Sequence, residues 1–501
     1  MQLKQLLQAV PTLKIEGTVD REVTGITYDS RRVTPGVVFV AVPGQNVDGH
    51  EFINSAIDRG ASAIICERNG FSSPRATKIK VADAREAMAH AAAVFYGRPA
   101  DRLKLIGITG TNGKTTVAFM VRQMLEISGV HTGLISTVRY EIGARLIPAH
   151  RTTPEALDIH QLFDQMVRAQ CQACVMEVSS HALEQKRVAG IAYDVALFTN
   201  LTQDHLDYHG TMENYYLAKE KLFRAAPGGK KQSAVINIDD GCGARLSKAT
   251  DFAIQMTYGL SESAQLRATK VELGKDGTRF TVEAPEHSFD IRMPLIGRHN
   301  IYNALAAIGA GLVLKLEVAA IRTALSQMPP VPGRLESVPC GQPFGVYVDY
   351  AHTDDALSNV LKTVRELTPN GRVLLLFGCG GSRDKGKRSK MGRVAAELAD
   401  FSLITSDNPR KESAAEIAAQ IDAGFREVRS DGYQLELDRR RAIVEILRQA
   451  RPGDSVLLAG KGHETYQEFE DSVVPFDDRV YARETLESLG WKRGQNSKGR
   501  H

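Results

Sequence analysis

The stretch GITGTNGKTT, residues 107–116, constrains the fold more than any other part of the sequence. Its first three residues end an apolar run at 103–109 that predicts a buried strand. Its last two begin the segment 115–128, which carries apolar side chains at helical spacing. A strand, a glycine-rich loop and a helix in this order predict a phosphate-binding loop, because glycines let backbone N–H groups point at phosphate oxygens. Lys114 is expected to reach the β and γ phosphates, and Thr115 to bind Mg²⁺.

The spacing of this loop departs from the strict P-loop pattern. That pattern requires Gly at position 108, where this chain has Ile108, and the glycines stand at 107 and 110 instead. A turn without function is the alternative, but the strand–loop–helix context and the dipole of the helix N-terminus favour phosphate. The residues predicted to bind ATP are Gly110, Thr111, Asn112, Gly113, Lys114, Thr115 and Thr116.

Length and composition exclude several classes of protein. The 501 residues suggest about three domains. A net charge of +4 is too small to indicate a nucleic-acid partner. Six scattered cysteines fit a reducing compartment. No apolar run approaches the roughly 18 residues of a membrane span, and the N-terminus does not resemble a signal peptide. We therefore expect a cytoplasmic protein without a membrane span, acting as a monomer.

Short apolar runs alternate with helical patterns along the chain, which predicts an α/β fold with largely parallel sheets. Polar stretches that contain Pro and Gly, at 96–102 and 331–338, predict two domain joints. The predicted domains are therefore 1–98, 99–334 and 335–501. We expect a smaller N-terminal α/β domain, a central domain with a P-loop-type, mostly parallel sheet, and a C-terminal Rossmann-like domain.

Clusters of polar residues follow the predicted strands at their carboxyl ends, where ligands bind in open parallel sheets. The clusters lie at 110–116, 179–181, 349–352, 380–384, 407–410 and 460–464. Six clusters at corresponding ends predict sites formed between two facing sheets. The stretch Asp407-Asn408-Pro409-Arg410, taken alone, has the ordinary alternative of a surface turn.

A set of longer motifs adds a family resemblance that covers nearly the whole chain. Beside GTNGKTT these are YDSRRVTPGVVFVAVPGQNVDGHEF (28–52), MEVSSHALEQKRV (176–188), FTNLTQDHLDYHGTMENYYLAKEKLF (198–223), GRHNIYNALAA (297–307), VDYAHTDDAL (348–357), FGCGGSRDKGKRSKM (377–391) and AGKGHETYQ (459–467). With these motifs the sequence resembles the Mur ligases, ATP-dependent amide-forming enzymes of peptidoglycan precursor synthesis. The GTNGKTT loop is also typical of folylpolyglutamate synthetase.

The resemblance implies an enzyme that joins UDP-N-acetylmuramoyl-L-alanyl-D-glutamate to a diamino acid and hydrolyses ATP to ADP and phosphate. A carboxylate is a poor electrophile, so the γ-phosphoryl group must first convert it into an acyl phosphate. An amine then attacks this acyl phosphate through a tetrahedral intermediate. The enzyme must hold several anionic groups together and offset their repulsion with cations.

The resemblance also implies which residues serve the nucleotide and its metal ions. Glu177 and His205 match ligands of a second Mg²⁺, and Lys219 matches a carbamylated lysine that orients it. The alternatives are a structural ion pair for Glu177, a capping histidine for His205 and a solvated helix lysine for Lys219. The residues that border the nucleotide by resemblance are Asn300, Asn303, Arg334, Asp349 and His352.

Two further groups are implied for the two joined substrates. Tyr28, Ser30, Gln45, Asn46 and Val47 are expected at the uridine, and Thr152, Thr153, Ser179, Gln185 and Arg187 at the muramoyl peptide and its pyrophosphate. The amino-acid group consists of Arg383, Asp407, Asn408, Pro409, Arg410, Gly460 and Glu464. The DNPR stretch resembles members that add meso-diaminopimelate. Asp407 and Asn408 would engage the distal ammonium, and Arg410 would grip the distal carboxylate with two hydrogen bonds.

The chain departs from the family pattern at three positions. Asp354 stands where the family often has Pro, Ser382 replaces a common Asp, and Ser389 replaces a common Pro. Three alternative functions remain: a folylpolyglutamate-synthetase-like glutamate ligase, a lysine-adding Mur ligase, and a regulatory nucleotide-binding switch without ligation. The N-terminal domain of about 98 residues disfavours the first, and Arg410 disfavours the second. The metal and amino-acid residues disfavour the third.

Overall fold

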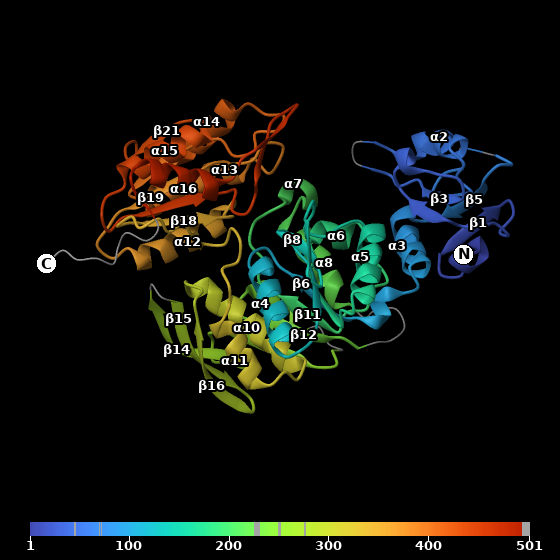
Figure 1. Cartoon of the computed structure of the whole chain (residues 1–501), viewed down its shortest axis with the longest axis horizontal. Coiled ribbons are helices and arrows are strands. Elements are labelled where there is room, and N and C mark those ends of the chain that lie inside the picture. Colours follow the sequence, from blue (N-terminus) through green and yellow to red (C-terminus); the bar gives the residue numbers. More distant parts are fainter. Residues whose placement is uncertain are drawn as a thin grey trace.

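The computed structural model of the chain describes residues 1–44, 47–69, 71, 73–224, 231–248, 252–274 and 277–492. Three main sheets follow one another along the chain, and the central body lies between the N-terminal and C-terminal bodies (Figure 1). Each sheet falls within one of the three predicted segments, while the domain boundaries themselves stay a prediction. No helix among the described residues is long and apolar enough to cross a membrane.

The N-terminal sheet has five strands in the order β1-β5-β4-β3-β2. The strands are β1 (Thr12–Glu16), β2 (Gly25–Thr27), β3 (Val37–Val40), β4 (Ala63–Cys66) and β5 (Thr77–Val81), and the helices are α1 (Leu3–Leu7), α2 (Ile53–Asp58) and α3 (Ala84–Phe95). Only β1 pairs in antiparallel fashion. Alternate residues of β3 face opposite sides of the sheet. Val38 and Val40 therefore pack with α1 and α3, and Phe39 packs with α2.

The central sheet has eleven strands in the order β16-β15-β14-β13-β12-β11-β6-β10-β7-β8-β9. The strands are β6 (Lys104–Thr109), β7 (Thr132–Ile135), β8 (Arg139–Ile142), β9 (Arg145–Pro148), β10 (Ala173–Glu177), β11 (Val195–Phe198), β12 (Ser233–Asn237), β13 (Gln255–Gly259), β14 (Leu266–Gly274), β15 (Gly277–Ala284) and β16 (His287–Met293). Its middle is parallel from β14 to β7. Antiparallel pairs extend both edges.

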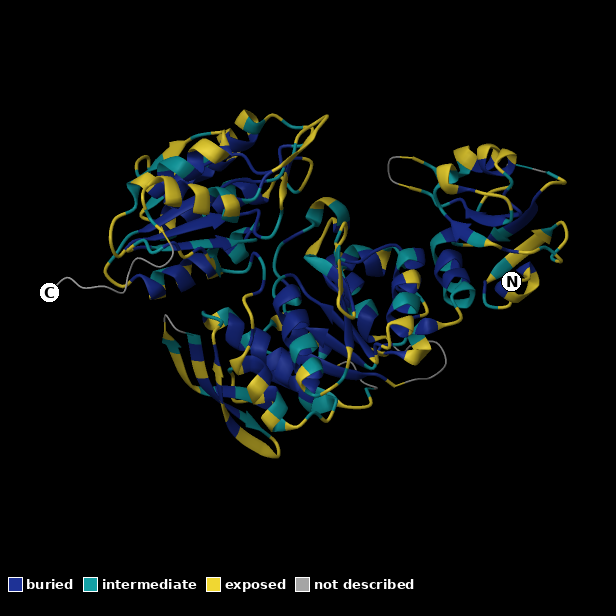
Figure 2. Cartoon of the chain, in the orientation of Figure 1, coloured by how far each residue is buried: buried dark blue, intermediate teal, exposed yellow. Residues whose placement is uncertain are grey.

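Helices cover both faces of the central sheet. They are α4 (Lys114–Ile127), α5 (Ala156–Arg168), α6 (Ser180–Glu184), α7 (Leu206–His209), α8 (Met212–Glu220), α9 (Gly241–Leu246), α10 (Arg298–Val313) and α11 (Val318–Ser326). Helices α4, α10 and α11 share one apolar core, and α5, α6, α8 and α9 contribute to the core on the other face. The parallel strands in the middle of the sheet are buried between these layers, while the outer helix faces and parts of the antiparallel edge strands are exposed (Figure 2).

The C-terminal sheet has six strands in the order β17-β18-β22-β19-β20-β21. The strands are β17 (Glu336–Ser337), β18 (Gly345–Asp349), β19 (Val373–Phe377), β20 (Phe401–Ile404), β21 (Tyr433–Leu435) and β22 (Ser455–Ala459). Helices α12 (Asp354–Leu367), α13 (Lys387–Leu398) and α14 (Ala414–Arg426) cover one face, and α15 (Arg439–Gln449) and α16 (Asp478–Ser488) the other. A separate hairpin joins β23 (Tyr466–Glu468) to β24 (Val473–Pro475).

A buried ion pair holds two strand ends of the C-terminal sheet together. Arg439 donates from Nε and Nη2 to the carboxylate of Asp478 at 2.8 and 2.6 Å, and both side chains are fully buried. The same guanidinium donates to the carbonyl oxygens of Ser406, just after β20, and Ala459, the last residue of β22. The loops that carry Asp407 and Gly460 therefore leave the sheet from a common, cross-linked base.

The structure confirms the α/β class and the predicted strands to within a few residues. The strand predicted at 103–109 is β6, and the helix predicted at 115–128 is α4. The apolar runs at 174–178, 195–200, 234–238, 346–350, 373–378, 401–405 and 455–460, each of which predicts a strand, form β10, β11, β12, β18, β19, β20 and β22. The antiparallel extension from β14 to β16 was not predicted. Its alternation of buried and exposed residues is that of a sheet with one solvated face, not of a fully buried parallel strand.

Candidate active site

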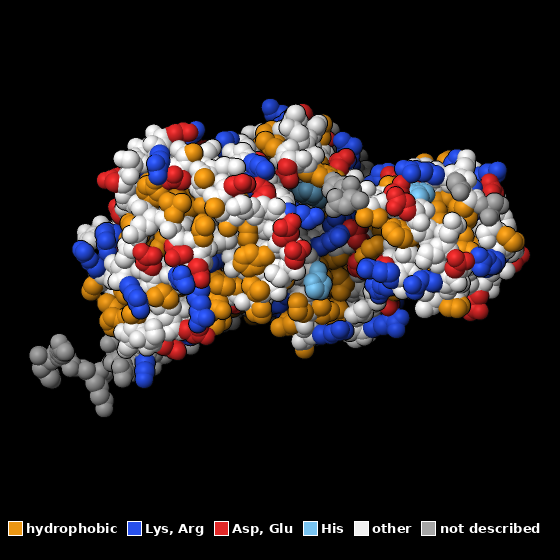
Figure 3. All heavy atoms as spheres, turned by 90° about the horizontal axis from the view of Figure 1, so that it is seen from above, with side chains coloured by type: hydrophobic (Ala, Val, Ile, Leu, Met, Phe, Trp, Pro, Cys, Tyr) orange, Lys and Arg blue, Asp and Glu red, His pale blue; other side chains and the backbone are white. Residues whose placement is uncertain are grey.

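Two adjoining cavities lie where the central body meets the C-terminal body. One, of about 510 Å³, is lined by the phosphate loop, and the other, of about 690 Å³, by the loops after β19, β20 and β22. Six residues line both cavities, namely Thr137, Thr152, Asp204, His205, Tyr350 and His352. The cavities therefore share a wall. On the face seen in Figure 3, histidines and charged side chains gather near the middle of the molecule.

The phosphate loop has the backbone shape that its glycines allow. Gly110 has φ of 147° and Gly113 has φ of 86°, both in a region that side chains disfavour. A Cβ on Gly113 would also lie 2.3 Å from Oδ1 of Asn303. Asn303 is itself oriented by a 2.9 Å hydrogen bond that it donates to Asn300. The close approach of α10 to the loop thus requires glycine at position 113.

Lys114, the first residue of α4, folds back over the loop. Its Nζ donates to the carbonyl oxygens of Gly110 at 3.0 Å and Thr111 at 2.8 Å. Burial lowers the pKa of this ammonium, whereas the charges of Glu177 and Asp204 oppose that shift. The Lys114 ammonium is therefore held over the loop by two carbonyl oxygens. Phosphate oxygens of a bound nucleotide would take the place of these carbonyl oxygens.

Two contacts join the C-terminal part of the chain to the phosphate loop. Arg334 donates from Nη2 to Oγ1 of Thr115 at 3.0 Å, and Nδ2 of Asn112 donates to Asp355 at 2.8 Å. The Arg334 guanidinium also lies 4.8 Å from the ring centre of Tyr350. Asp349 accepts hydrogen bonds from the backbone of Leu335, which follows Arg334 in sequence. The predicted residues Arg334 and Asp349 thus meet beside the loop.

Glu177, the last residue of β10, is fully buried and faces the nucleotide cavity. Thr137 donates to its carboxylate from the backbone N–H at 2.9 Å and from the side-chain hydroxyl at 3.0 Å. The Thr137 hydroxyl lies 3.0 Å from that of Thr152. These hydrogen bonds orient the carboxylate. The structural ion pair considered as an alternative is not formed among the described residues.

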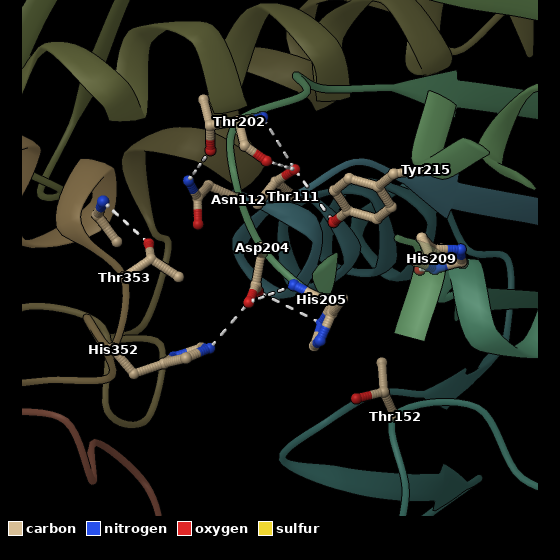
Figure 4. A network of polar contacts seen from close by, with 12 residues as sticks. Thr111, Asn112, Thr152, Thr202, Asp204, His205, His209, Tyr215, His352 and Thr353 are labelled. Atoms are coloured by element: carbon tan, nitrogen blue, oxygen red, sulfur yellow. Dashed lines mark hydrogen bonds and ion pairs between the residues drawn. The ribbon is translucent and has the colours of Figure 1, made fainter. Parts of the chain in front are cut away.

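His205 and His352 approach Asp204 from two sides (Figure 4). Their Nε2 atoms lie 3.3 and 3.8 Å from the same carboxylate oxygen. Burial lowers the pKa of His205, and the charge of Asp204 opposes the shift. His205 also adopts φ of 54° and stands at the N-cap of α7, although its side chain makes no capping hydrogen bond. Its ring instead faces the wall between the cavities.

Lys219 lies on α8 behind the phosphate loop and is buried. Its Nζ donates to the carbonyl oxygen of Gly110 at 2.7 Å and sits 4.5 Å from the ring centre of Tyr215. Burial lowers the pKa of Lys219 well below its usual value, and the charge of Lys114 lowers it further. The solvated helix lysine considered as an alternative is therefore wrong. Lys219 does not line either of the two cavities described above.

Asn408 and Glu464 form the polar floor of the larger cavity together with Lys461. Lys461 is fully buried and donates to Oδ1 of Asn408 at 3.1 Å and to Glu464 at 3.0 Å. Asn408 donates to the same Glu464 oxygen at 2.8 Å. Burial raises the pKa of Glu464, and the neighbouring Asp407 raises it further. A Cβ on Gly460, whose φ is 111°, would lie 2.5 Å from Asp407.

Arg410 and Arg383 both line the larger cavity. Arg410 donates from Nε to Glu468 at 2.7 Å and from Nη1 to the carbonyl oxygen of Gly381 at 3.0 Å. Arg383 is exposed and donates to the carbonyl oxygen of Ser382. Pro409 lies between the lining residues of this loop and is not itself among them.

Of the described residues predicted for the UDP-sugar peptide, Thr152 lines the two cavities and the others lie outside them. Thr153, Ser179, Gln185 and Arg187 form one hydrogen-bonded cluster, in which Arg187 donates to the carbonyl oxygen of Thr153 and to Gln185. In the N-terminal body, Ser30 begins a short 3₁₀ helix, Val47 is exposed, and the Tyr28 hydroxyl donates to Asp158 of α5. Gln45 and Asn46 lie outside the described residues.

Sequence reasoning missed several residues that the structure brings to the site. They are Thr137, Asp204, Asp355, Lys387, Lys461 and Glu468. Lys387 is buried at the start of α13 and lines the larger cavity. Its motif GSRDKGKRSK was noticed, but the motif holds four other Lys and Arg residues, so the sequence did not single out Lys387. Asp204 and Lys461 also stood in quoted motifs, whereas Glu468 carried no local signal.

The three departures from the family pattern fit the local structure. Asp354 is in the first turn of α12, after the N-cap Thr353, where an acidic side chain favours the helix dipole. Ser382 adopts φ of 53° while its backbone N–H donates to Glu412. Ser389 lies within α13 and its backbone packs closely against Gly424. None of the three lines the two cavities.

A glycine-rich loop between a strand and a helix, beside a second polar cavity, is typical of a nucleotide-dependent enzyme. Comparison with known proteins identifies the family. The models for the Mur ligase family catalytic domain, the Mur ligase middle domain and the Mur ligase glutamate ligase domain match residues 22–96, 108–311 and 333–462. The chain belongs to the Mur ligase family, whose members are ATP-dependent, ADP-forming ligases, so the predicted resemblance is confirmed.

Individual relatives match over the full length. A UDP-N-acetylmuramoyl-L-alanyl-D-glutamate–2,6-diaminopimelate ligase from Solibacter usitatus is 46% identical over 99% of this chain and 100% of its own. One of the same name from Syntrophomonas wolfei is 43% identical over 96% and 99%. A solved structure with that name has 30% identity and a TM-score of 0.69, covering 98% and 99%. Folylpolyglutamate synthase of Mycobacterium tuberculosis has 18% identity and a TM-score of 0.61, covering 82% and 96%, which is a likeness of fold alone.

Gly113→Ala tests the close packing of the phosphate loop. Alanine would be forced into the left-handed backbone conformation of Gly113, and its Cβ would displace Asn303. We therefore expect KM for ATP to rise about tenfold or more, the equivalent of about 1.4 kcal/mol. Gly129→Ala is the matched control, because Gly129 has a similar φ of 80° with open space around it. Steady-state kinetics and urea unfolding of both variants measure the effect. A similar KM for ATP in the two variants would contradict this account.

Proposed function

We propose that this chain joins meso-2,6-diaminopimelate to UDP-N-acetylmuramoyl-L-alanyl-D-glutamate, with conversion of ATP to ADP and phosphate. The observation that carries the proposal is the shared wall: a cavity with Asp407, Asn408 and Arg410 adjoins the cavity of the phosphate loop. An amino acid in the first cavity would therefore present its amine to a carboxylate activated beside the second. The names of the full-length relatives support the same reaction.

Phosphoryl transfer is the first step. The substrate carboxylate attacks the γ-phosphorus of ATP, which forms the acyl phosphate and releases ADP. Lys114 exchanges the carbonyls of Gly110 and Thr111 for phosphate oxygens. Arg334, at the proposed boundary of the central and C-terminal domains, and Lys387 of the C-terminal domain add positive charge. The neutral amine then attacks the acyl carbon, and the tetrahedral intermediate loses a proton from nitrogen and collapses to the amide. The bond between the acyl carbon and the phosphate oxygen breaks, and phosphate leaves with that proton.

Mg²⁺ is proposed as the metal ion that accompanies ATP. Among the described residues, no three His, Cys, Asp or Glu side chains form a ready-made metal cluster. The oxygen donors preferred by Mg²⁺ are nevertheless present, since the hydroxyl of Thr115 and the buried carboxylate of Glu177 line the nucleotide cavity together with His205. When bound, Mg²⁺ would neutralise phosphate oxygens: Thr115 would hold one ion, and Glu177 and His205 would hold a second ion that carbamylated Lys219 would orient.

The environment of Lys219 supports its carbamylation. A lowered pKa leaves a larger fraction of neutral amine, and this amine attacks CO₂ to form an N–C bond and release one proton. The resulting carbamate is anionic, so it would relieve the repulsion between Lys219 and Lys114 and add oxygen donors to the site of Glu177 and His205.

The remaining assignments concern the substrates and the setting of the reaction. Asp407, Asn408 and Glu464 are proposed to bind the distal ammonium of diaminopimelate, with Arg383 and Arg410 near its distal carboxylate. The cluster of Thr153, Ser179, Gln185 and Arg187, with the N-terminal domain, is proposed to hold the UDP-sugar peptide. We also propose domain boundaries near residues 98 and 334, a cytoplasmic location and a monomeric state.

Lys219→Ala tests the carbamate. We expect kcat/KM for ligation to fall by about 10²-fold or more, the usual effect of removing one preorganised electrostatic group. Lys221→Ala is the control, since Lys221 lies two residues away and pairs with Glu184. NMR of the enzyme under ¹³CO₂ should show a carbamate signal that Lys219→Ala lacks and Lys221→Ala retains. A wild-type enzyme that turns over without this signal would exclude the modification.

Arg410→Ala tests the choice of amino acid and the proposed function. The wild-type enzyme should use diaminopimelate, and lysine or glutamate very poorly, because each lacks part of the distal head that the site binds. Arg410→Ala should cost about 2–5 kcal/mol for diaminopimelate, roughly 30- to several-thousand-fold in kcat/KM, and much less for lysine. Arg410→Lys should restore only part, since an ammonium lacks the two-pronged geometry. Equal losses on both amino acids would mean that Arg410 supports the fold.

A further inference from the structure

Glu468, the last residue of β23, makes three contacts with the loop that carries Arg410. Its backbone N–H donates to Oδ1 of Asn408 at 2.9 Å, and its carbonyl oxygen accepts from the backbone N–H of Arg410 at 3.1 Å. Its carboxylate accepts from Nε of Arg410 at 2.7 Å. The hairpin therefore runs alongside residues 408–410, and only the third contact depends on the side chain of Glu468.

The carboxylate of Glu468 determines which edge of the Arg410 guanidinium remains available. Nε is engaged by Glu468 and one hydrogen of Nη1 by the carbonyl oxygen of Gly381. No described residue accepts a hydrogen bond from Nη2. A planar guanidinium held at Nε and Nη1 has its Nη1–Nη2 end left for a carboxylate, and this end can make two parallel hydrogen bonds.

Glu468 acts on the cavity through Arg410. Arg410 lines the larger cavity, whereas Glu468 is not among its lining residues. Space for the guanidinium is limited, because a Cβ on Gly380 would lie 2.9 Å from Nη1 of Arg410. The Arg410 side chain is mostly buried, while that of Glu468 is about one-third exposed. The carboxylate thus stands on the solvent side of the guanidinium and holds it against the loop of Gly380 and Gly381.

We infer that Glu468 is a positioning residue for amino-acid selection: it holds the Arg410 guanidinium with its Nη1–Nη2 end toward the distal carboxylate of the incoming amino acid. This inference rests on the proposed function. Without the carboxylate, Arg410 keeps its charge but gains rotamer freedom, which it must lose again on each binding event. Loss of the Glu468 carboxylate should therefore weaken the affinity for an amino acid with a distal carboxylate. The affinity for lysine should not change, because lysine lacks that group.

The test compares Glu468→Ala and Glu468→Gln in the full-length chain, with diaminopimelate and lysine as amino acids. Glu468→Ala should raise KM for diaminopimelate about threefold to tenfold, the scale of immobilising one flexible side chain, with kcat within about twofold. Its kcat/KM for lysine should stay unchanged. Glu468→Gln should recover most of the loss, because the amide oxygen still accepts from Nε. Glu470→Ala is the matched control, an exposed acid on the same hairpin.

A double-mutant cycle separates positioning from an independent effect. Arg410→Ala with Glu468→Ala should behave like Arg410→Ala alone, because the carboxylate has nothing left to hold. Additive losses, equal losses on diaminopimelate and lysine, or an unchanged or lower KM for diaminopimelate in Glu468→Ala would each overturn the inference. Failure of the proposed function would be seen separately, as a wild-type enzyme that does not ligate diaminopimelate.

Discussion

Repulsion between a carboxylate and a triphosphate is the constraint on which the arrangement of this molecule depends. An acyl phosphate forms only where both anions are held together, so cations must surround the point of contact. Lys114 comes from the central body, whereas Arg334 and Lys387 come from the C-terminal part of the chain. Parallel strands deliver their following loops to one edge of a sheet, and two such edges face each other here. Neither sheet alone carries the full set.

The charged groups of the site have hydrogen-bond partners within the protein. Lys114 is held by carbonyl oxygens, Arg334 by the hydroxyl of Thr115, and Lys461 by Asn408 and Glu464. Buried charges without partners are costly, so these contacts stabilise the site, and in the proposed reaction a bound substrate would replace some of them. Such an exchange favours ligands that supply equivalent hydrogen bonds. Selection among amino acids follows, because a ligand without the matching group leaves a charged side chain unpaired.

Local sequence patterns predicted the elements and loops of this chain but few of the contacts between them. The apolar run and glycines at 103–116 specify a strand, a loop and a helix through short-range conformational preferences, and β6 and α4 have this form. The contact between Thr115 and Arg334 joins residues 219 positions apart, and that between Arg410 and Glu468 crosses to a separate hairpin. Such pairs depend on tertiary packing, and neither Thr137 nor Glu468 has a distinctive neighbourhood in sequence.

The transfer of oxygen from the substrate carboxylate to phosphate tests the central claim most directly. The carboxylates of UDP-N-acetylmuramoyl-L-alanyl-D-glutamate would be labelled with ¹⁸O and ligated to diaminopimelate with unlabelled ATP. Through an acyl phosphate, one carboxylate oxygen becomes the bridging oxygen and leaves with the phosphoryl group. Each inorganic phosphate released should therefore carry one ¹⁸O atom for each amide formed, as measured by mass spectrometry. Amide formation with unlabelled phosphate would contradict the account.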